Sequence, residues 1–369
     1  METVDILVIG AGVIGLAIAE RLAGPGKDVV VCERHDGFGR ETSSRNSEVI
    51  HCGMYYAESL LKTTLCVRGN PILYELCSRA GIAHRKTGKI VVATDESESE
   101  KLHQILDQGK KNGVPGLRLI SSKEITDTEP RVSGLLGLYS PESGIVDSHR
   151  LMEYLERSAA SRGATVSYGS EVTGIRREGP RYSVEIRQSD GDLVVLGAAC
   201  VINSAGLSAD RIAAMAGIDV DRAGYRIHPC KGEYFRISSR HRGSIRHLVY
   251  PTPSPVHLGA HVVVGLDGGL KIGPDSTYVD AIDYTVDVGH QRAFFEKARR
   301  FLPFLSFDDL APDMSGIRPK LYRQGEPFRD FIIREEGDRG LAGLISLIGM
   351  ESPGLTSCLA IAEKVESLL

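Results

Sequence analysis

Three glycines near the start of the chain have the spacing of a phosphate-binding turn. Gly10, Gly12 and Gly15 form the pattern Gly-x-Gly-x-x-Gly directly after the apolar run VDILVIG. The first glycine permits a tight turn, the second lets the backbone approach a pyrophosphate, and the third lets helix and strand pack closely. The amides at the start of the helix, which include those of Val13 and Ile14, favour phosphate through the helix dipole. The spacing predicts a dinucleotide site.

An acidic residue supports the same interpretation. Glu33 ends the second apolar run, DVVVCE, 23 residues after Gly10. A carboxylate about 20 residues after the glycines is expected to bind the ribose hydroxyls. The alternative, a glycine-rich turn that binds nothing, does not account for the order of strand, helix, strand and acid.

Features further along the chain favour FAD over NAD. The hydroxyl and amide side chains that follow Arg34 are expected near the diphosphate, and they are Thr42, Ser43, Ser44, Asn46 and Ser47. The backbone of Val172 is expected to contact adenine. Ala205 and Gly206 end an apolar strand with small residues, which allow close approach to a cofactor.

The end of the chain supplies a second helix start. The residues expected to approach the flavin there are Gly349, Glu351, Ser352, Pro353, Gly354, Leu355 and Thr356. Amides at the start of a helix can stabilise the negative charge that a flavin acquires on reduction. An NAD dehydrogenase has no use for this second helix start.

The elements that must position these residues alternate along the chain. Buried strands and helices of the dinucleotide-binding type recur at the start, middle and end, and strand-rich insertions interrupt them twice. We predict an α/β protein with a discontinuous Rossmann-type FAD-binding domain and a mixed α+β substrate domain, whose large sheet is mainly antiparallel. The expected boundaries are 1–82, 146–218 and 313–369 for the FAD-binding domain, and 83–145 and 219–312 for the substrate domain.

Composition excludes several classes of protein. The 369 residues carry a formal charge of −4, which argues against a nucleic-acid partner. No apolar run reaches the ~18 residues that a transmembrane helix needs. The first apolar stretch lacks the basic residues of a secretory signal. The seven cysteines are scattered without a CxxC pair, so we predict no metal site and a reduced, cytoplasmic protein.

Together these residues resemble the D-amino-acid-oxidase-like FAD superfamily, and within it the L-2-hydroxyglutarate dehydrogenases and oxidases. The stretch 46–56, NSEVIHCGMYY, is similar to that family's NSGVIHSGIYY. Further similarities lie at 231–234, 249–251, 258–261 and 272–274. Glu48, Cys52 and Met54 depart from the family pattern, and residues 316–319 (GIRP) also resemble the GxRP of amine oxidases.

The resemblance implies roles for two histidines and an arginine. His51 lies where the family places residues beside the flavin, and an imidazole with a pKa of ~6.5 suits removal of a hydroxyl proton. His261 is a second candidate for the base or for a donor to a carboxylate. Arg318 can bind a carboxylate through two hydrogen bonds or lie over the flavin. We predict catalytic roles for these three residues, although either histidine could instead be structural.

Four further residues are expected at the substrate. Lys231 could bind a distal carboxylate or be merely solvated. Tyr55, Tyr56 and Tyr250 are expected to line the pocket, with aromatic packing as the alternative.

The sequence predicts oxidation of a small, carboxylate-bearing 2-hydroxy acid by hydride transfer to FAD. Quinone or oxygen is the expected electron acceptor, and peripheral contact with the inner face of the membrane is left open. Oxidation of a small amine or amino acid such as glycine or sarcosine is the alternative. A regulatory module that binds flavin without catalysis is a third.

Overall fold

The computed structural model describes residues 2–253 and 261–369, and the chain forms two compact units. Unit 1 comprises Met1–Ser44, Ser148–Pro229 and Arg318–Leu369, and unit 2 comprises Arg45–Asp147 and Cys230–Ile317. Each unit is therefore assembled from segments that are distant in sequence.

Unit 1 contains a β-α-β start, a middle segment rich in strands and a C-terminal strand and helix. Its elements are β1 (Glu2–Ile9), α1 (Val13–Leu22), β2 (Val29–Cys32), α5 (Ser148–Ser161), β9 (Thr165–Ser167), β10 (Ser170–Glu178), β11 (Arg181–Gln188), β12 (Leu193–Asn203), α6 (Ala209–Met215), α7 (Val220–Ala223), β19 (Ile332–Glu336), β20 (Leu341–Ile348) and α9 (Gly354–Glu366).

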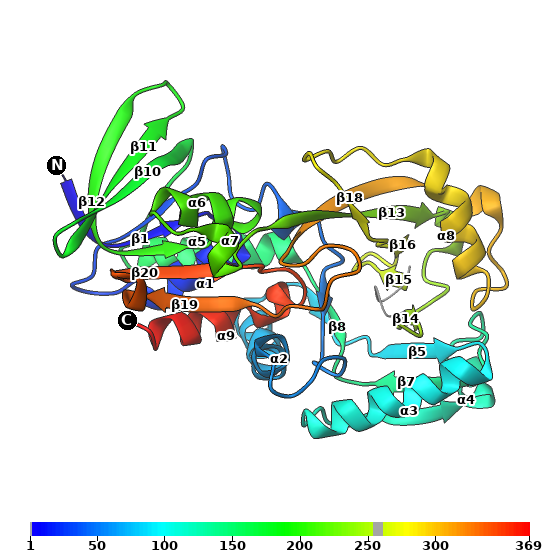
Figure 1. The fold of residues 1–369 in the computed structure, drawn as a ribbon. Helices are drawn as coiled ribbons and strands as arrows, with labels where there is room; N and C mark the ends of the chain where they lie inside the picture. Colours follow the sequence, from blue (N-terminus) through cyan, green and yellow to red (C-terminus); the bar gives the residue numbers. More distant parts are fainter. Residues whose placement is uncertain (1, 254–260) are drawn as a thin grey trace. The chain divides into compact units, whose positions relative to one another are not determined.

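The sheet of unit 1 joins all three of its segments. Its strand order is β10-β11-β12-β1-β2-β9, and β20 also pairs with β12 (Figure 1). The pairs β1–β12, β1–β2, β2–β9 and β12–β20 are parallel, whereas β10, β11 and β19 pair antiparallel with their neighbours. Parallel pairing around a first strand that leads into a glycine turn is the arrangement expected of a Rossmann-type sheet.

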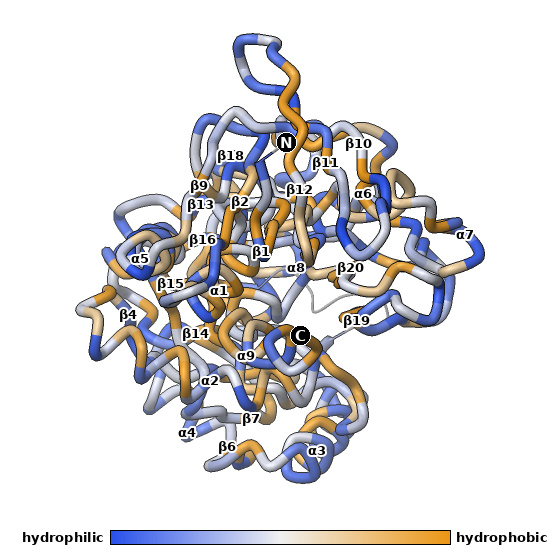
Figure 2. The backbone as a smooth tube through the Cα atoms, turned by 90° about the vertical axis from the view of Figure 1, so that its left-hand side faces the viewer, coloured by the Kyte–Doolittle hydropathy of each residue, from blue (hydrophilic) through white to orange (hydrophobic). Residues whose placement is uncertain are grey.

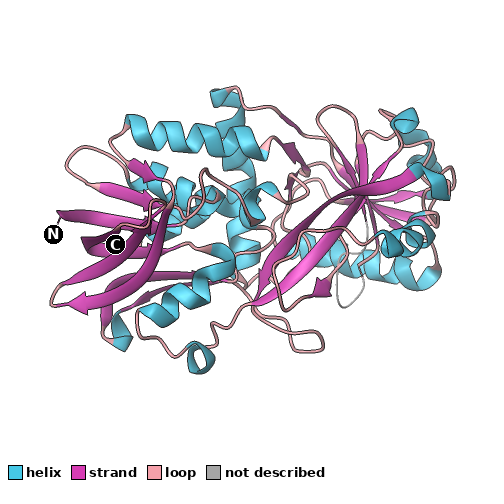
Figure 3. Ribbon diagram, turned by 90° about the horizontal axis from the view of Figure 1, so that it is seen from above, coloured by secondary structure: helices cyan, strands magenta, loops and turns pink. Residues whose placement is uncertain are grey.

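Helices lie on both sides of this sheet (Figure 3). Leu7 and Ile9 of β1 pack into a core with Ile212 of α6, whereas α1 packs against α5 and α9. The tube of Figure 2 is orange along much of β1, β2 and α1, as expected for elements buried on most sides. Across the described residues, no helix has both the length and the apolar composition that crossing a bilayer requires.

Unit 2 is built around a larger sheet. Its elements are β3 (Val49–Ile50), α2 (Leu61–Ala80), β4 (His84–Arg85), β5 (Lys89–Ala93), α3 (Glu96–Lys111), β6 (Arg118–Ser121), α4 (Ser122–Thr128), β7 (Leu136–Ser140), β8 (Gly144–Val146), β13 (His228–Ile237), β14 (Leu248–Pro251), β15 (His261–Val264), β16 (Leu270–Gly273), β17 (Thr277–Tyr278), α8 (Gln291–Ala298) and β18 (Leu310–Lys320). Strands β13 and β18 continue across the boundaries between the units.

The large sheet has the order β17-β13-β16-β15-β14-β5-β7-β6, and β18 pairs with β13. Strands β14 and β5 pair in parallel, and the pairs around them are antiparallel. This agrees with the mainly antiparallel sheet expected from sequence. Because side chains alternate across a strand, the sheet presents two different faces.

The two faces carry different cores. On one face, Val249 and Val262 pack with Phe294 of α8. On the other, Val91 and Val263 pack with the side chains of α3. This second face also carries the polar residues of the candidate site.

The boundaries of the units differ from those expected. We assigned residues 45–82 to the FAD-binding domain, but they belong to unit 2, because β3 pairs with β8. Residues 219–229 belong to unit 1, since Val220, Tyr225 and Ile227 pack into its core. Residues 313–317 lie in β18, which pairs with β13 in unit 2, and the short segment 146–147 is also in unit 2.

Candidate functional site

The glycine turn of unit 1 has no room for side chains. A Cβ atom at Gly15 would lie 2.0 Å from the backbone oxygen of Gly10, and Gly10 itself has a φ of +102°. Gly12 is the N-cap of α1, and no side chain caps the helix from that position. The turn therefore brings backbone amides together at the start of α1, where phosphate groups can bind.

Two predicted cofactor residues lie against this turn. The carboxylate of Glu33 is buried and accepts hydrogen bonds from the amides of Ala11 at 2.8 Å and His35 at 2.9 Å. The hydroxyl of Ser43 accepts a hydrogen bond from the amide of Val13 at 3.0 Å. The structure thus brings the acid, the hydroxyl-rich loop and the glycine turn together, whereas the exposed Arg34 is ion-paired with Glu41.

The start of the C-terminal helix lies beside the start of α1. A Cβ atom at Gly354, the first residue of α9, would lie 3.5 Å from the side chain of Ile14. No side chain caps α9 from Pro353. Within the turn before it, the amide of Glu351 donates to the carbonyl of Gly349 at 2.8 Å. Two helix N-termini from opposite ends of the chain therefore meet in one unit.

The other predicted cofactor residues are more scattered. Ala205 follows β12, and its Cα atom would lie 3.3 Å from a Cβ at Gly10, so the backbone at Ala205 packs directly against the glycine turn. Val172 is buried in β10, next to a shift of strand register between Val172 and Gly174. Asn46 and Ser47 belong to unit 2, where the hydroxyl of Ser47 is 2.8 Å from that of Tyr234. The remaining predicted residues are Thr42 and Ser44 in a short 3₁₀ helix, Gly206 after β12, and Ser352, Leu355 and Thr356 around the start of α9.

The second polar group lies on one face of the sheet of unit 2. Successive strands place Lys89 of β5, Tyr250 of β14 and His261 of β15 on the same face as Val91 and Val263. The rings of Tyr250 and His261 stack, with centroids 3.7 Å apart and an interplanar angle of 16°. The ammonium of Lys89 lies 4.1 Å from the centroid of the Tyr250 ring.

His51 joins this group from the signature stretch. Its backbone oxygen accepts a hydrogen bond from the side chain of Asn70 at 2.8 Å, so α2 fixes the position of the histidine. Burial lowers the pKa of His51 well below its usual value, and the neighbouring charges of Lys89 and His261 lower it further. His51 is therefore neutral at physiological pH. We expected an ordinary pKa near 6.5, and that expectation was wrong because the imidazole is desolvated.

The tyrosines around this group are also perturbed. Burial raises the pKa of Tyr55 and of Tyr250 well above the usual value for a phenol. Their hydroxyls lack hydrogen-bond partners among the described residues. We define the polar cluster as His51, Tyr55, Lys89, Tyr250 and His261, all of which belong to unit 2.

Three predicted residues lie outside the polar cluster. Lys231 is buried beside Glu233 and Asp283, with Nζ 3.3 Å from a carboxylate oxygen of each. Its charge is already compensated, so these contacts favour a structural role over binding a distal carboxylate. Arg318 begins the last segment of unit 1. Tyr56 lies with its ring 5.5 Å from the ammonium of Lys62. Residues 258–260 lie outside the described residues.

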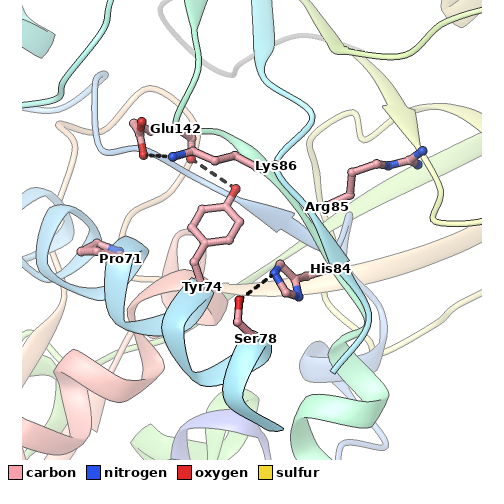
Figure 4. Close-up of a pocket in the computed structure, with 7 residues that line it drawn as sticks. All are labelled: Pro71, Tyr74, Ser78, His84, Arg85, Lys86 and Glu142. Atoms are coloured by element: carbon pink, nitrogen blue, oxygen red, sulfur yellow. Dashed lines mark hydrogen bonds and ion pairs between the residues drawn. The ribbon is translucent and has the colours of Figure 1, made fainter. Parts of the chain in front are cut away.

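A surface pocket of 410 Å³ lies elsewhere on unit 2, between α2 and β4 (Figure 4). Within it, Lys86 pairs with Glu142 at 2.5 Å, and Ser78 and His84 are hydrogen-bonded at 3.3 Å. None of the predicted site residues lines this pocket. Its polar groups satisfy one another, so it differs from the polar cluster.

The comparison with protein families decides between the interpretations. The model of the DAO family, described as FAD dependent oxidoreductases, matches residues 5–368. The chain belongs to this family. As an FAD-dependent oxidoreductase it is an enzyme, so the alternative of a non-catalytic flavin-binding module is set aside.

Curated and solved relatives cover nearly the whole oxidoreductase. The mitochondrial L-2-hydroxyglutarate dehydrogenase of Arabidopsis thaliana is 38% identical over 402 residues, which cover 99% of this chain and 83% of the plant protein. The human mitochondrial L-2-hydroxyglutarate dehydrogenase is 29% identical, with 97% of this chain and 87% of the human protein covered. The FAD-bound, dithionite-reduced L-alpha-glycerophosphate oxidase of Mycoplasma pneumoniae has a TM-score of 0.88 at 25% identity, covering 100% and 95% of the two chains. These relatives confirm the expected fold class and family resemblance.

The residues of unit 1 fit the cofactor of this FAD-dependent oxidoreductase. Cβ atoms at Gly10 and Gly15 would collide with backbone oxygens, so the tight turn and the close helix–strand packing of a dinucleotide-binding motif both depend on these glycines. The glycine turn and Glu33 would hold the adenosine diphosphate part, and the start of α9 would face the flavin. These assignments of individual residues remain predictions.

Sequence reasoning missed Lys89 and Asn70. Lys89 could have been found from the sequence, because it starts the apolar run KIVVA. A lysine that alternates in step with the buried residues of a strand is unusual. Asn70 had no such signal, because its contact with His51 depends on how α2 packs.

Proposed function

We propose that this oxidoreductase converts L-2-hydroxyglutarate, or a closely similar 2-hydroxy acid, to the 2-oxo acid. The observation that carries the proposal is the 38% identity to a plant L-2-hydroxyglutarate dehydrogenase over 99% of the chain. The polar cluster supports it, since His51, the base predicted from the resemblance, lies in the same group as His261.

The chemistry requires two transfers from the substrate. The hydroxyl proton leaves to a base, the hydrogen on C2 leaves with its electron pair, and a C=O bond forms. FAD supplies the hydride acceptor when it is bound. His51 is neutral and so has a ring nitrogen that can accept the proton. Arg318 is proposed to bind a carboxylate of the substrate through its guanidinium.

Oxidation of an amine or amino acid is the second candidate, and the motif GIRP at residues 316–319 favours it. An anaerobic substrate panel distinguishes the two. We expect L-2-hydroxyglutarate to bleach the flavin absorbance near ~450 nm, and its D enantiomer, glycine and sarcosine to leave it unchanged. Bleaching by glycine or sarcosine with no response to L-2-hydroxyglutarate would reverse the assignment.

The electron acceptor is proposed to be a quinone or oxygen. Enzyme reduced by substrate under argon is mixed either with a water-soluble quinone or with air, and the return of flavin absorbance is timed. A faster return of absorbance with the quinone would support a quinone acceptor, and a faster return in air would support oxygen. A cytoplasmic location and peripheral contact with the membrane also remain proposals.

A further inference from the structure

Lys89 is a buried cation without a counter-charge. Its side chain has 0% exposed surface, and its Nζ atom has no hydrogen-bond partner among the described residues. The residues outside the described part, 1 and 254–260, include no Asp or Glu that could supply a carboxylate. An unpaired buried ammonium is costly, so proteins usually pair it or place it at a functional site.

Two more buried donors surround this ammonium. The hydroxyls of Tyr55 and Tyr250 are also buried and have no partners among the residues that the structure describes. The ring centroids of these tyrosines lie 5.5 and 4.1 Å from Nζ. Three buried donors in one place, with no carboxylate paired to the ammonium among the described residues, indicate that a group with several acceptor oxygens belongs there.

The residues of the polar cluster differ in exposure. His51 and Tyr55 are only partly buried, whereas Lys89, Tyr250 and His261 have at most 4% exposed surface. The stacked imidazole of His261 covers one face of Tyr250, so the ammonium lies against the other face. A ligand bound at this cluster would therefore contact hydrogen-bond donors.

We propose that Lys89, together with the hydroxyls of Tyr55 and Tyr250, binds a carboxylate of the substrate. A carboxylate supplies two oxygens, with about four acceptor positions, and the negative charge that the ammonium lacks. This inference rests on the proposed function, because it places a carboxylate beside the proposed base His51. It also replaces Lys231, whose charge is already compensated, as the lysine that recognises the substrate.

The test measures binding without turnover. Holoenzymes carrying Lys89→Met or Lys89→Gln are titrated calorimetrically with 2-oxoglutarate, the product of the proposed reaction. We expect the dissociation constant to rise on the order of 30-fold, because a hydrogen bond to a charged group is lost. The matched control is Lys271→Met, which removes a half-exposed lysine ion-paired with Asp313 at 3.1 Å, and we expect a change below about twofold.

Each outcome decides the inference. A loss of affinity of about 30-fold with normal FAD content supports the inference. If the methionine variant misfolds, the dissociation constant is measured on the glutamine variant. Unchanged affinity in the variants overturns it, even if L-2-hydroxyglutarate still bleaches the wild-type flavin and the proposed function stands. Loss of FAD from the variants also overturns it, because Lys89 would then serve the cofactor. If the wild type binds neither 2-oxoglutarate nor L-2-hydroxyglutarate, the proposed function itself fails and the inference fails with it.

Discussion

Replacing Lys89 by methionine is expected to stabilise the folded holoenzyme at pH 7, although it removes a functional group. Burial lowers the pKa of Lys89 from 10.5 to about 8, and no carboxylate offsets the effect. At about 1.4 kcal/mol per pKa unit, this difference corresponds to about 3 kcal/mol of folding free energy. Methionine has a similar shape and no charge, so the variant avoids this cost.

The destabilisation by Lys89 should depend on pH. In the unfolded chain, Lys89 keeps its ordinary pKa near 10.5, so between pH 8 and 10.5 the unfolded state binds more protons than the folded state. Wild-type stability therefore rises with pH across this window, as far as Lys89 determines it. Electrostatic interactions with Cys52 and Cys66 raise the pKa of Lys89, but by less than burial lowers it. The advantage of the variant should be largest below pH 8 and disappear by about pH 10.5.

Urea unfolding followed by circular dichroism measures this difference directly. Wild type and Lys89→Met are compared at pH 7 and pH 10 with the FAD concentration held constant, because bound cofactor also stabilises the fold. We expect the midpoint of the variant to exceed that of the wild type at pH 7, with an unchanged m-value. Lys271→Met should differ from the wild type by less than about 0.5 kcal/mol. A variant less stable than the wild type at pH 7 would show that the Lys89 ammonium is compensated in the folded enzyme, and the reasoning would be refuted.

Two further predictions test the cofactor turn and the proposed base. Gly15→Ala should lower the ratio of flavin to protein absorbance and weaken FAD binding by at least about tenfold, because its Cβ would lie 2.0 Å from the oxygen of Gly10. The control Gly24→Ala should keep its flavin, because the nearest atom to its Cβ would be the end of an arginine side chain 3.9 Å away. Full flavin content in Gly15→Ala would contradict this. His51→Asn should lower kcat by about 10²–10⁴-fold, and His84→Asn by less than about twofold. Because the pKa of His51 is well below its usual value, wild-type kcat/KM should show no loss of activity near pH ~6.5, and an acidic limb there would argue against His51 as the base.

The parts of the site that depend on local geometry were predictable from the sequence. The glycine spacing and Glu33 predict a turn in which a Cβ at Gly15 would meet Gly10, and the structure has that geometry. The helix start at Gly354 was also predictable, because a glycine-rich turn follows a buried strand. Its position beside Ile14 follows from the shared sheet, since β12 pairs in parallel with both β1 and β20.

The parts that depend on packing between distant strands were not predictable. Lys89 and Tyr250 become neighbours because β5 pairs in parallel with β14, an exception in a mainly antiparallel sheet. The lowered pKa of His51 follows from desolvation by residues that pack around it, which no local pattern reports. Residues 45–82 were assigned to the wrong unit because their helical pattern says nothing about which sheet they accompany.

The polar cluster explains why a costly group would be retained in this fold. A base that accepts a hydroxyl proton must be neutral before the reaction, and both the burial of His51 and the charge of Lys89 favour that state. A substrate carboxylate that pairs with Lys89 would offset the cost of the ammonium and would also bring the hydroxyl beside the base. The buried ammonium of Lys89 destabilises the free enzyme, and pairing with an anionic substrate then contributes to the affinity for that substrate. This coupling requires that Lys89→Met be both more stable and poorer at binding, because a lysine with a purely structural role could not produce both effects.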